Sequence, residues 1–217
     1  MKNLLIIGAG GCGREVLQWA KDVNTALIRE GKQPRWNIKG FLDDNPRALD
    51  GKKCDICVLS SVDDYEISEN DEFICSIGSS VIRERVMDKM KERGAAFTGI
   101  VHPTAIVADS AVLGEAVIIY PFALISDNAV IGDGCIVNMY SSIAHDSKLG
   151  RYCTISAHCD VTGMCTLGEH VFMGTTSNLV PSSRVGNHVY ICAGSTVMTR
   201  LRDGVKVLGC PARKVAL

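Results

Sequence analysis

The chain has 217 residues, a formal net charge of −1 and 47% hydrophobic residues. Because the charge is close to zero, nothing attracts the protein non-specifically to nucleic acid or to an anionic membrane surface, and neither partner is expected. The longest apolar runs fall far short of the roughly 18 residues of a membrane-spanning helix. We therefore expect no membrane span.

Residues 3–7 form an apolar run, and the glycine pattern G-x-G-x-x-G follows at Gly8, Gly10 and Gly13. With only one basic residue before it, this short run is typical of a buried strand rather than a signal peptide, so we expect a cytoplasmic protein. Apolar residues then recur at helical spacing over residues 14–29. Strand, glycine turn and helix form the phosphate-binding opening of a doubly wound α/β domain. The alternative is a tight turn whose glycines only allow close helix packing.

A second strand is expected over residues 37–42, and Asp43 and Asp44 follow it. Carboxylates at the carboxyl end of a strand in such a sheet suit a ribose or a base edge. They lie about 30 residues beyond the glycines, further than the roughly 20 residues usual for dinucleotide folds. The alternative is an ordinary Asx turn before Pro46.

Further strands are expected over residues 56–59, 73–78 and 97–101, and a helix over residues 81–92. Gly78 ends the second of these strands. It should lie beside the glycine loop, because the carboxyl ends of parallel strands meet at the edge where ligands gather. The first part of the chain therefore predicts an α/β domain with a Rossmann-like parallel sheet.

A strict repeat of six residues begins at Val107. This period fits neither a helix nor a plain strand, but it fits a solenoid in which three short strands form one triangular coil, so that positions 18 apart stack. The aliphatic residue of each hexad should point inward, a small residue four places later should fit the corner, and a glycine directly after the aliphatic residue should accept a strained turn. The inward series is Val107, Leu113, Ile119, Ile125, Ile131, Val137, Ile143, Leu149, Ile155, Val161, Leu167, Met173, Leu179, Val185, Ile191 and Val197.

Two domains are thus expected: residues 1–101 with the Rossmann-like sheet, and residues 102–217 with an all-β parallel β-helix built from hexapeptide repeats. The repeats fade after Leu201, and the polar, turn-rich tail that follows is suited to cap the open end.

The chain has ten cysteines. Four of them occupy the small inward position of the repeat, where a free thiol behaves as a small hydrophobe. Cys54 and Cys57 have the C-x-x-C spacing of a redox or zinc site. No second C-x-x-C and no paired histidines accompany them, whereas a structural zinc needs four ligands. The sequence therefore predicts no metal site, and disulfides are not expected in a reducing compartment.

His145 and Asp146 carry the best acid–base chemistry within the hexads. His145 stands two places after the inward Ile143, near a turn, and can face outward. A carboxylate beside an imidazole can fix its tautomer and raise its basicity. Asn138 precedes the pair on the adjoining edge. The alternative is a solvated histidine without a function.

The other four histidines are expected to be ordinary solvated side chains. His102 stands before a proline at the domain junction. Three share one repeat position, three places after the inward residue: His158, His170 and His188.

Together these features resemble a known family. The segments that carry the resemblance are residues 8–13 after the first strand, Phe41 to Asp44, Ile77 and Gly78, His102 and Pro103, Asn138 with His145 and Asp146, and Gly209 to Arg213. The hexads resemble the left-handed β-helix acyltransferases. Nearly the whole chain is similar to the sugar O- and N-acetyltransferases that include the sialic acid O-acetyltransferases and the bacterial UDP-4-amino-sugar N-acetyltransferases.

The resemblance implies a left-handed β-helix and a homotrimer with acetyl-CoA bound in clefts between neighbouring β-helices. It implies that His145 is the general base, that Asp146 tunes it, and that the N-terminal domain holds a nucleotide-sugar. Implied substrate-binding positions are Gly10, Gly11, Cys12, Asp43, Asp44, Gly78 and Asn138. Implied acetyl-CoA contacts are Thr154, Gly163, Thr175, Ala193 and Gly194.

Two departures from the family pattern bear on the substrate. The glycine loop commonly carries Ser and His where this chain has Gly10 and Cys12, so a histidine contact to the diphosphate is lost. Some members have a histidine at the position of Thr154, where it touches acetyl-CoA. Thr154 can keep a hydrogen bond but cannot act as a second imidazole.

The resulting hypothesis is an acetyltransferase. An amine or hydroxyl of a sugar, nucleotide-linked in the first instance, attacks the thioester of acetyl-CoA while His145 takes its proton, with no covalent enzyme intermediate. One alternative is an O-acetyltransferase acting on a free sugar acid or a polysaccharide precursor. Another is a non-catalytic β-helix protein that binds a nucleotide. A metal-dependent reaction, as in β-helix carbonic anhydrases, needs histidines that meet across a subunit interface, and their spacing here is not the expected one.

Overall fold

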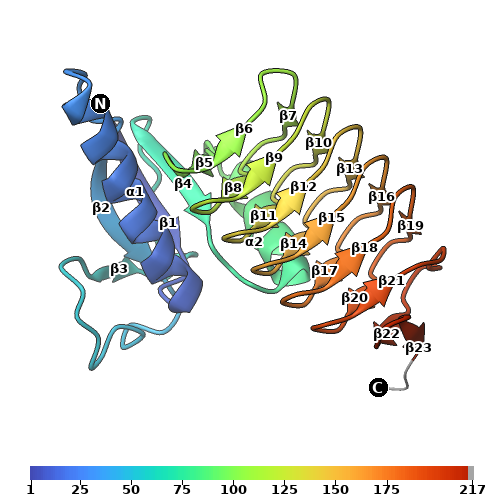
Figure 1. Cartoon of the computed structure of the whole chain (residues 1–217). Coiled ribbons are helices and arrows are strands. Elements are labelled where there is room, and N and C mark those ends of the chain that lie inside the picture. The colour runs from blue at the N-terminus through green and yellow to red at the C-terminus, as the bar shows by residue number, and fades with distance from the viewer. Residues whose placement is uncertain (215–217) are drawn as a thin grey trace. The chain divides into compact units, whose positions relative to one another are not determined.

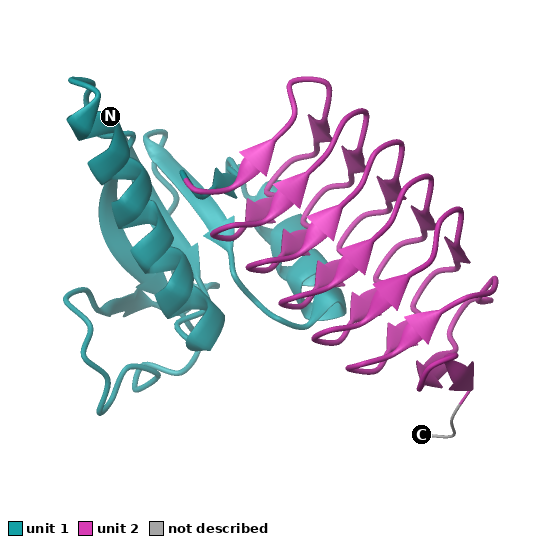
Figure 2. Cartoon of the chain, in the orientation of Figure 1, with its two compact units in different colours: residues 1–103 teal, residues 104–217 magenta. Residues whose placement is uncertain are grey.

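A computed structural model describes residues 1–214 of the chain. The chain divides into two compact units, Met1–Pro103 and Thr104–Leu217 (Figure 2). Within the described residues, both helices belong to the first unit, and the second is a stack of short strands (Figure 1). We call them the N-terminal unit and the β-helix.

The N-terminal unit is built on a parallel sheet with the strand order β3-β2-β1-β4. In β1 the last four residues, Leu4 to Ile7, are fully buried. A continuous apolar run of this kind is typical of a parallel strand that is covered on both faces. The predicted Rossmann-like sheet is confirmed. Its strands are β1 (Lys2–Ile7), β2 (Trp36–Leu42), β3 (Val58–Ser60) and β4 (Asp71–Cys75).

Helix α1 (Gly11–Arg29) begins at Gly11 rather than at Arg14, where the apolar periodicity begins. Gly13 allows this early start, because a Cβ there would lie 1.8 Å from the carbonyl oxygen of Gly8. The first turn of the helix therefore packs against the end of β1 more closely than any side chain permits.

The segment after β4 also differs from the prediction. The strand ends at Cys75 rather than at residue 78, and the hydroxyl of Ser76 lies 2.8 Å from the carbonyl oxygen of Ile7. This bond ties the end of β4 to the end of β1. Helix α2 (Ser80–Glu92) follows, capped by the side chain of Ser79. Of the strand predicted over residues 97–101, only β5 (Ile100–Val101) forms, and it is not part of this four-stranded sheet.

The β-helix has three faces, each a sheet in which parallel strands from successive coils lie side by side. The first face holds β6 (Ile106–Val107), β9 (Leu124–Ile125), β12 (Ser142–Ile143), β15 (Asp160–Val161), β18 (Asn178–Leu179) and β21 (Thr196–Val197). The second holds β7 (Val112–Leu113), β10 (Val130–Ile131), β13 (Lys148–Leu149), β16 (Thr166–Leu167) and β19 (Arg184–Val185). The third holds β8 (Ile118–Ile119), β11 (Ile136–Val137), β14 (Thr154–Ile155), β17 (Phe172–Met173), β20 (Tyr190–Ile191), β22 (Lys206–Leu208) and the antiparallel β23 (Arg213–Lys214).

The strand pairing follows the predicted stacking of positions 18 apart. Ile143, for example, pairs with Ile125 in the coil before and with Val161 in the coil after. The inward aliphatic residues from Ile119 to Val197 are all at most 4% exposed, and the four cysteines of the repeat are fully buried: Cys135, Cys153, Cys159 and Cys165. The coil interior is therefore filled by the residues that the period of six selects.

The prediction that the glycines after the inward residues accept strained turns is wrong. Gly150, which represents them, does not have a positive φ, but a Cβ on it would lie 2.6 Å from the carbonyl carbon of Gly168 in the next coil. Close stacking of coils is therefore what requires glycine here. Left-handed backbone occurs elsewhere in the turns, with φ between 53° and 62°, at Ala116, Phe122, Asn128, Tyr140, Asp146, Tyr152, His158, Met164, His170, Thr176, Ser182 and His188.

The last coil breaks the regular register. Leu201 forms a bridge with Val185, a separation of 16 residues in place of 18. The turn after β21 is therefore two residues shorter than the turns before it. The polar tail then adds β22 beside β20 and turns back as β23.

Neither helix found within residues 1–214 combines the length and the apolar character required to cross a membrane.

Replacing Gly150 tests the stacking argument. Gly150→Ala should lower the free energy of unfolding by about 1–3 kcal/mol, because the added methyl group overpacks two coils. Chemical denaturation followed by circular dichroism measures the change. Gly78→Ala is the control, since a Cβ there meets nothing within 4 Å, and it should leave the unfolding midpoint unchanged. Equal effects of the two changes would contradict the argument.

Candidate active site

His145 and Asp146 lie in the turn between β12 and β13, where the first and second faces meet. Nδ1 of His145 lies 2.8 Å from Oδ2 of Asp146, and the two side chains are 56% and 54% exposed. The backbone N–H of Asp146 donates to the carbonyl oxygen of Asp127 in the coil before, at 3.0 Å. The turn thus holds the carboxylate beside one ring nitrogen and leaves Nε2 open to a reacting partner.

We call this edge the His145 corner: residues 144–147 and the equivalent turns 162–165, 180–183 and 198–200. One coil beyond His145 stands Gly163, which was predicted as an acetyl-CoA contact. A Cβ on Gly163 would lie 2.6 Å from Nε2 of His145 and 2.7 Å from its Cε1. The imidazole therefore lies against bare backbone, and any side chain at Gly163 would displace it.

The other predicted contacts of the β-helix lie away from this corner. Asn138 stands in a turn where the third and first faces meet, and Thr175, Ala193 and Gly194 stand in later turns of that same edge, which we call the Asn138 corner. Thr154 lies on the third face, in β14. The first face separates the two corners, so within one chain Gly163 is the predicted acetyl-CoA contact that lies beside the predicted base, and the contacts of the Asn138 corner do not.

Two histidines differ from the expectation of solvated side chains. His102 is only 7% exposed, and its Nε2 lies 3.2 Å from Oδ2 of Asp22. His170 is 8% exposed because its ring stacks between those of Tyr152 and His188, with centroids 5.5 and 4.6 Å away. The column of equivalent turn positions brings these rings together, which a single hexad does not reveal.

A cavity of about 480 Å³ opens in the N-terminal unit at the carboxyl ends of β1 and β2. Its apolar lining includes Leu42, Val62, Ile77, Ile82 and Val86, and its polar lining includes Asp43, Asp44, Asp63, Arg85 and Lys89. Of the predicted substrate-binding residues, the two aspartates line this cavity. Gly10, Gly11, Cys12 and Gly78 do not.

Asp43 organises the glycine loop. Its Oδ2 accepts the N–H of Ala9 at 2.7 Å, and its Oδ1 accepts the N–H of Asn45 at 2.9 Å. The predicted nucleoside contact is therefore already engaged by backbone amides, and it holds two loops at the rim of the cavity. A Cβ at Gly10 or Gly11 would meet nothing within 4 Å, so the loop leaves open space for a ligand.

Helix α2 supplies residues that the sequence reading did not assign. Arg83, although charged, is 1% exposed and donates from Nη1 to the carbonyl oxygen of Ile77 at 2.7 Å. Arg85 and Lys89 bring cations to the cavity. Lys89 lies 2.6 Å from Asp63, and its hydrogen bond holds the pKa of that carboxyl below its ordinary value. The signal was present in the sequence, because Ile82, Arg85, Val86 and Lys89 follow the spacing of one helix face.

Metal ligands do not gather in the described part of the chain. Within residues 1–214, no group of three His, Cys, Asp or Glu side chains is placed to hold a metal ion. Cys54 and Cys57 are both free thiols.

Known proteins share both units. Residues 3–90 match the family model of the PglD N-terminal domain, and residues 128–163 match that of the bacterial transferase hexapeptide (six repeats). The acetyltransferase domain of PglB from Neisseria gonorrhoeae FA1090 has a TM-score of 0.86 at 26% identity, covering 99% of this chain and 100% of that chain. Both units of the chain are thus similar to those of bacterial hexapeptide-repeat sugar acetyltransferases. The predicted left-handed β-helix and the predicted resemblance to sugar acetyltransferases are confirmed.

Two further relatives are informative. PerB from Caulobacter crescentus, in complex with CoA and GDP-perosamine, has a TM-score of 0.81 at 25% identity, covering 100% of this chain and 98% of that chain. The UDP-N-acetylbacillosamine N-acetyltransferase of Bacillus subtilis (strain 168) is 28% identical over 122 residues, 54% of this chain and 51% of that protein. The match therefore spans about half the length of this curated relative.

Gly163→Ala tests the contact between the imidazole and the Gly163 backbone. The ring of His145 should move away from Gly163 and lengthen its distance to Asp146, which a crystal structure of the variant measures. Because the displaced atoms are the end of an exposed side chain, the free energy of unfolding should fall by less than about 1 kcal/mol. Gly150→Ala makes the same chemical change two turns earlier along the chain and should leave His145 in place. An unmoved ring in Gly163→Ala would contradict the geometry.

Proposed function

We propose that the chain is an acetyl-CoA-dependent N-acetyltransferase whose acceptor is the amine of an amino sugar linked to a nucleotide. The observation that carries the proposal is the pairing of His145 with Asp146 at 2.8 Å beside the bare backbone of Gly163. The arrangement suits a general base, because Nδ1–H donates to the carboxylate and Nε2 keeps its lone pair.

The reaction follows from this arrangement. The sugar amine attacks the carbonyl carbon of the thioester, and Nε2 of His145 takes the proton that the amine loses. Asp146 keeps the ring oriented and stabilises the imidazolium. The C–S bond then breaks, and the thiolate of CoA leaves and is protonated. A backbone amide near the thioester would stabilise the developing oxyanion. No cysteine acts as a nucleophile.

The cavity of the N-terminal unit would hold the nucleotide. Its apolar side chains suit the flat face of a base, and Arg85 and Lys89 suit a diphosphate. The open space beside Gly10 and Gly11, at the N-terminus of α1, favours a phosphate as well. The relative crystallised with GDP-perosamine and the relative named for a UDP-linked product support a nucleotide-linked amino sugar.

A second copy of the chain would complete the site. The His145 corner and the Asn138 corner lie on either side of the first face, so acetyl-CoA in contact with both would lie between two copies. We therefore propose a homotrimer in which each cleft combines His145 of one protomer with Thr154, Thr175, Ala193 and Gly194 of its neighbour.

A thermal-shift screen tests the acceptor. UDP-, GDP-, dTDP- and CMP-sugars are compared beside acetyl-CoA, and the nucleotide that binds should raise the melting temperature by mass action. Lys89→Ala should weaken that shift without altering the shift caused by acetyl-CoA. A shift with acetyl-CoA but with no nucleotide would favour a free-sugar O-acetyltransferase. No shift with either would favour a non-catalytic protein.

Replacing His145 tests the mechanism. His145→Ala should lower kcat by roughly 10²- to 10⁴-fold, the usual contribution of a general base. Steady-state assays of CoA release measure it once the acceptor is known. His188→Ala is the matched control, since this exposed histidine stands where the second and third faces meet, and it should keep full turnover. Near-normal kcat in His145→Ala would remove the residue from the mechanism.

A further inference from the structure

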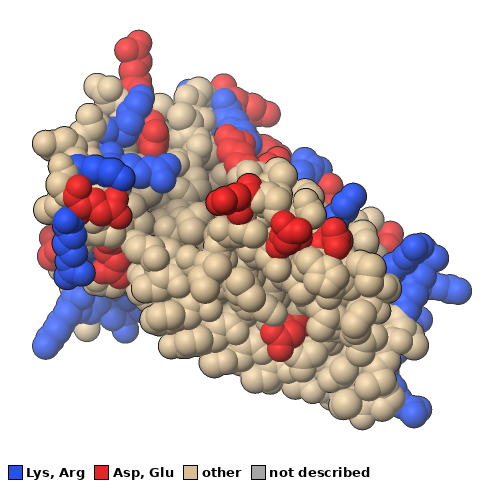
Figure 3. All heavy atoms as spheres, turned by 45° about the horizontal axis from the view of Figure 1, so that its top comes forward, with Lys and Arg blue, Asp and Glu red and all other residues tan. Residues whose placement is uncertain are grey.

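The charges of the β-helix are distributed unevenly. Residues 104–183 carry seven acidic side chains and two basic ones, whereas residues 184–214 carry six basic side chains and one acidic. Figure 3 shows Lys and Arg gathered at the C-terminal end of the β-helix, and mostly uncharged surface before it. This end is therefore the part of the β-helix that attracts an anion.

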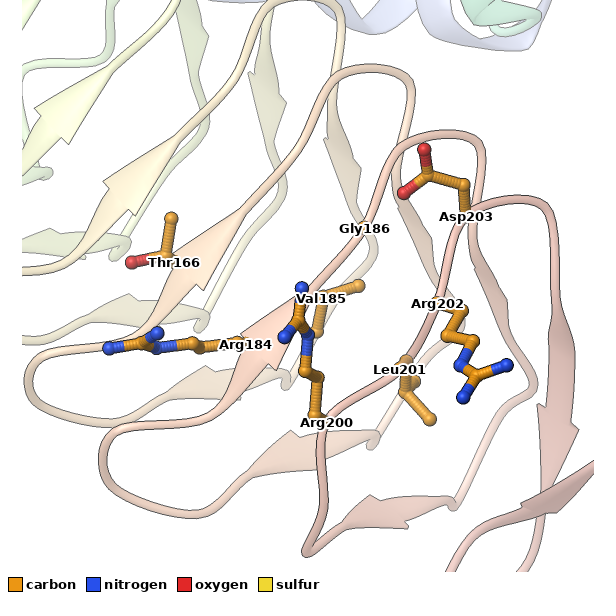
Figure 4. A pocket seen from close by; sticks show the side chains of 8 residues that line it. All are labelled: Thr166, Arg184, Val185, Gly186, Arg200, Leu201, Arg202 and Asp203. Carbon is orange, nitrogen blue, oxygen red and sulfur yellow. The ribbon is translucent and has the colours of Figure 1, made fainter.

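A cavity of about 600 Å³ lies at this end (Figure 4). Arg184, Arg200 and Arg202 line it, and none of the three forms an ion pair within residues 1–214. Asp203, its acidic residue, already accepts the N–H of Asn187 at 3.0 Å. The cavity thus presents uncompensated positive charge.

The shortened last coil decides which arginine stands beside Arg184. Because Leu201 pairs with Val185, the preceding residues Arg200 and Arg184 are neighbours on the outward side of the second face. Figure 4 shows the guanidinium groups of these two residues pointing in different directions, with that of Arg202 directed away from both. Two like charges on neighbouring strands repel each other, and a bound anion would remove that repulsion. With the regular spacing of 18, residue 202 would occupy that place.

The cavity continues along the His145 corner. A second hollow, of about 180 Å³, shares Arg184 and Arg200 with it and is also lined by Pro181 and Thr199. His145, Gly163, Pro181 and Thr199 occupy the same place in four successive turns. At the usual spacing of neighbouring strands, three coils span about 14 Å. A path along this edge therefore joins the imidazole to the arginines.

We propose that Arg184 and Arg200 bind the phosphorylated nucleotide end of acetyl-CoA. This inference rests on the proposed function. Acetyl-CoA carries its thioester at one end of a neutral pantetheine arm, and a diphosphate and a 3′-phosphate at the other end. The His145 corner matches this order, because the imidazole lies at one end and the unpaired guanidinium groups of Arg184 and Arg200 lie at the other. The planar fork of arginine suits phosphate oxygens.

Substrate truncation separates the phosphate contacts from the rest of the site. Arg184→Ala and Arg200→Ala should each raise KM for acetyl-CoA roughly tenfold or more, the usual weight of a charge-assisted hydrogen bond. KM for S-acetyl-pantetheine, which lacks the nucleotide, should change less than twofold, and kcat at saturation should stay the same. Acetyl-dephospho-CoA locates the contact: a smaller effect of the substitutions on this substrate assigns them to the 3′-phosphate, and an undiminished effect assigns them to the diphosphate.

Lys148→Ala is the matched control. Lys148 is an exposed cation in the same column of the second face, two coils before Arg184 and outside both hollows, and its loss should leave KM for acetyl-CoA unchanged. The proposal is wrong if the arginine substitutions leave KM unchanged, if they affect S-acetyl-pantetheine equally, or if they raise KM for the nucleotide-sugar instead.

Calorimetric titration with CoA distinguishes this proposal from the proposed function. If the wild-type protein binds CoA and Arg184→Ala weakens that binding, the result supports a CoA-binding role of the arginines even if no acetyl transfer is found. If the wild type transfers acetyl groups but Arg184→Ala leaves the affinity for CoA unchanged, the arginines do not bind CoA, and the proposed acetyltransferase function still stands.

Discussion

The structure depends on coils that stack at the spacing of hydrogen-bonded strands. Backbone bonds join each coil to the next, as from the N–H of Ser142 to the carbonyl oxygen of Cys159 at 2.9 Å. This spacing leaves no room for a Cβ at Gly150, and it selects small residues such as Cys153 for the inward corners. Because every coil repeats this constraint, residues 18 apart form straight columns on the outside.

The chemical environment of each turn depends on which side chains of neighbouring coils stand in the same column. At His145 and Gly163 a histidine stands beside a glycine of the next coil, so the imidazole lies against bare backbone. Three aromatic side chains in a column, Tyr152, His170 and His188, instead stack, and the middle ring of His170 is buried between the other two. The same turn geometry thus leaves a histidine exposed at one edge and buries a histidine at another.

The N-terminal unit uses charge in a comparable way. The carboxylate of Asp43 and the guanidinium of Arg83 both bond to backbone groups and hold the loops around the cavity. Arg85 and Lys89, from the same helix α2, line the cavity itself, and Lys89 is paired there with Asp63. Residues that look alike in the sequence therefore divide into those that hold the loops and those that line the cavity.

By itself the sequence determined the period of the β-helix, its inward residues, the parallel sheet of the N-terminal unit and the pairing of His145 with Asp146. These follow from local periodicity and from adjacency along the chain. Only the tertiary structure decided which glycines are needed for close approach, that His170 is buried, and that Arg200 lies beside Arg184. Each of these depends on which residue of a neighbouring coil faces the position, and a change of register by two residues, as at Leu201, alters that without altering the local pattern.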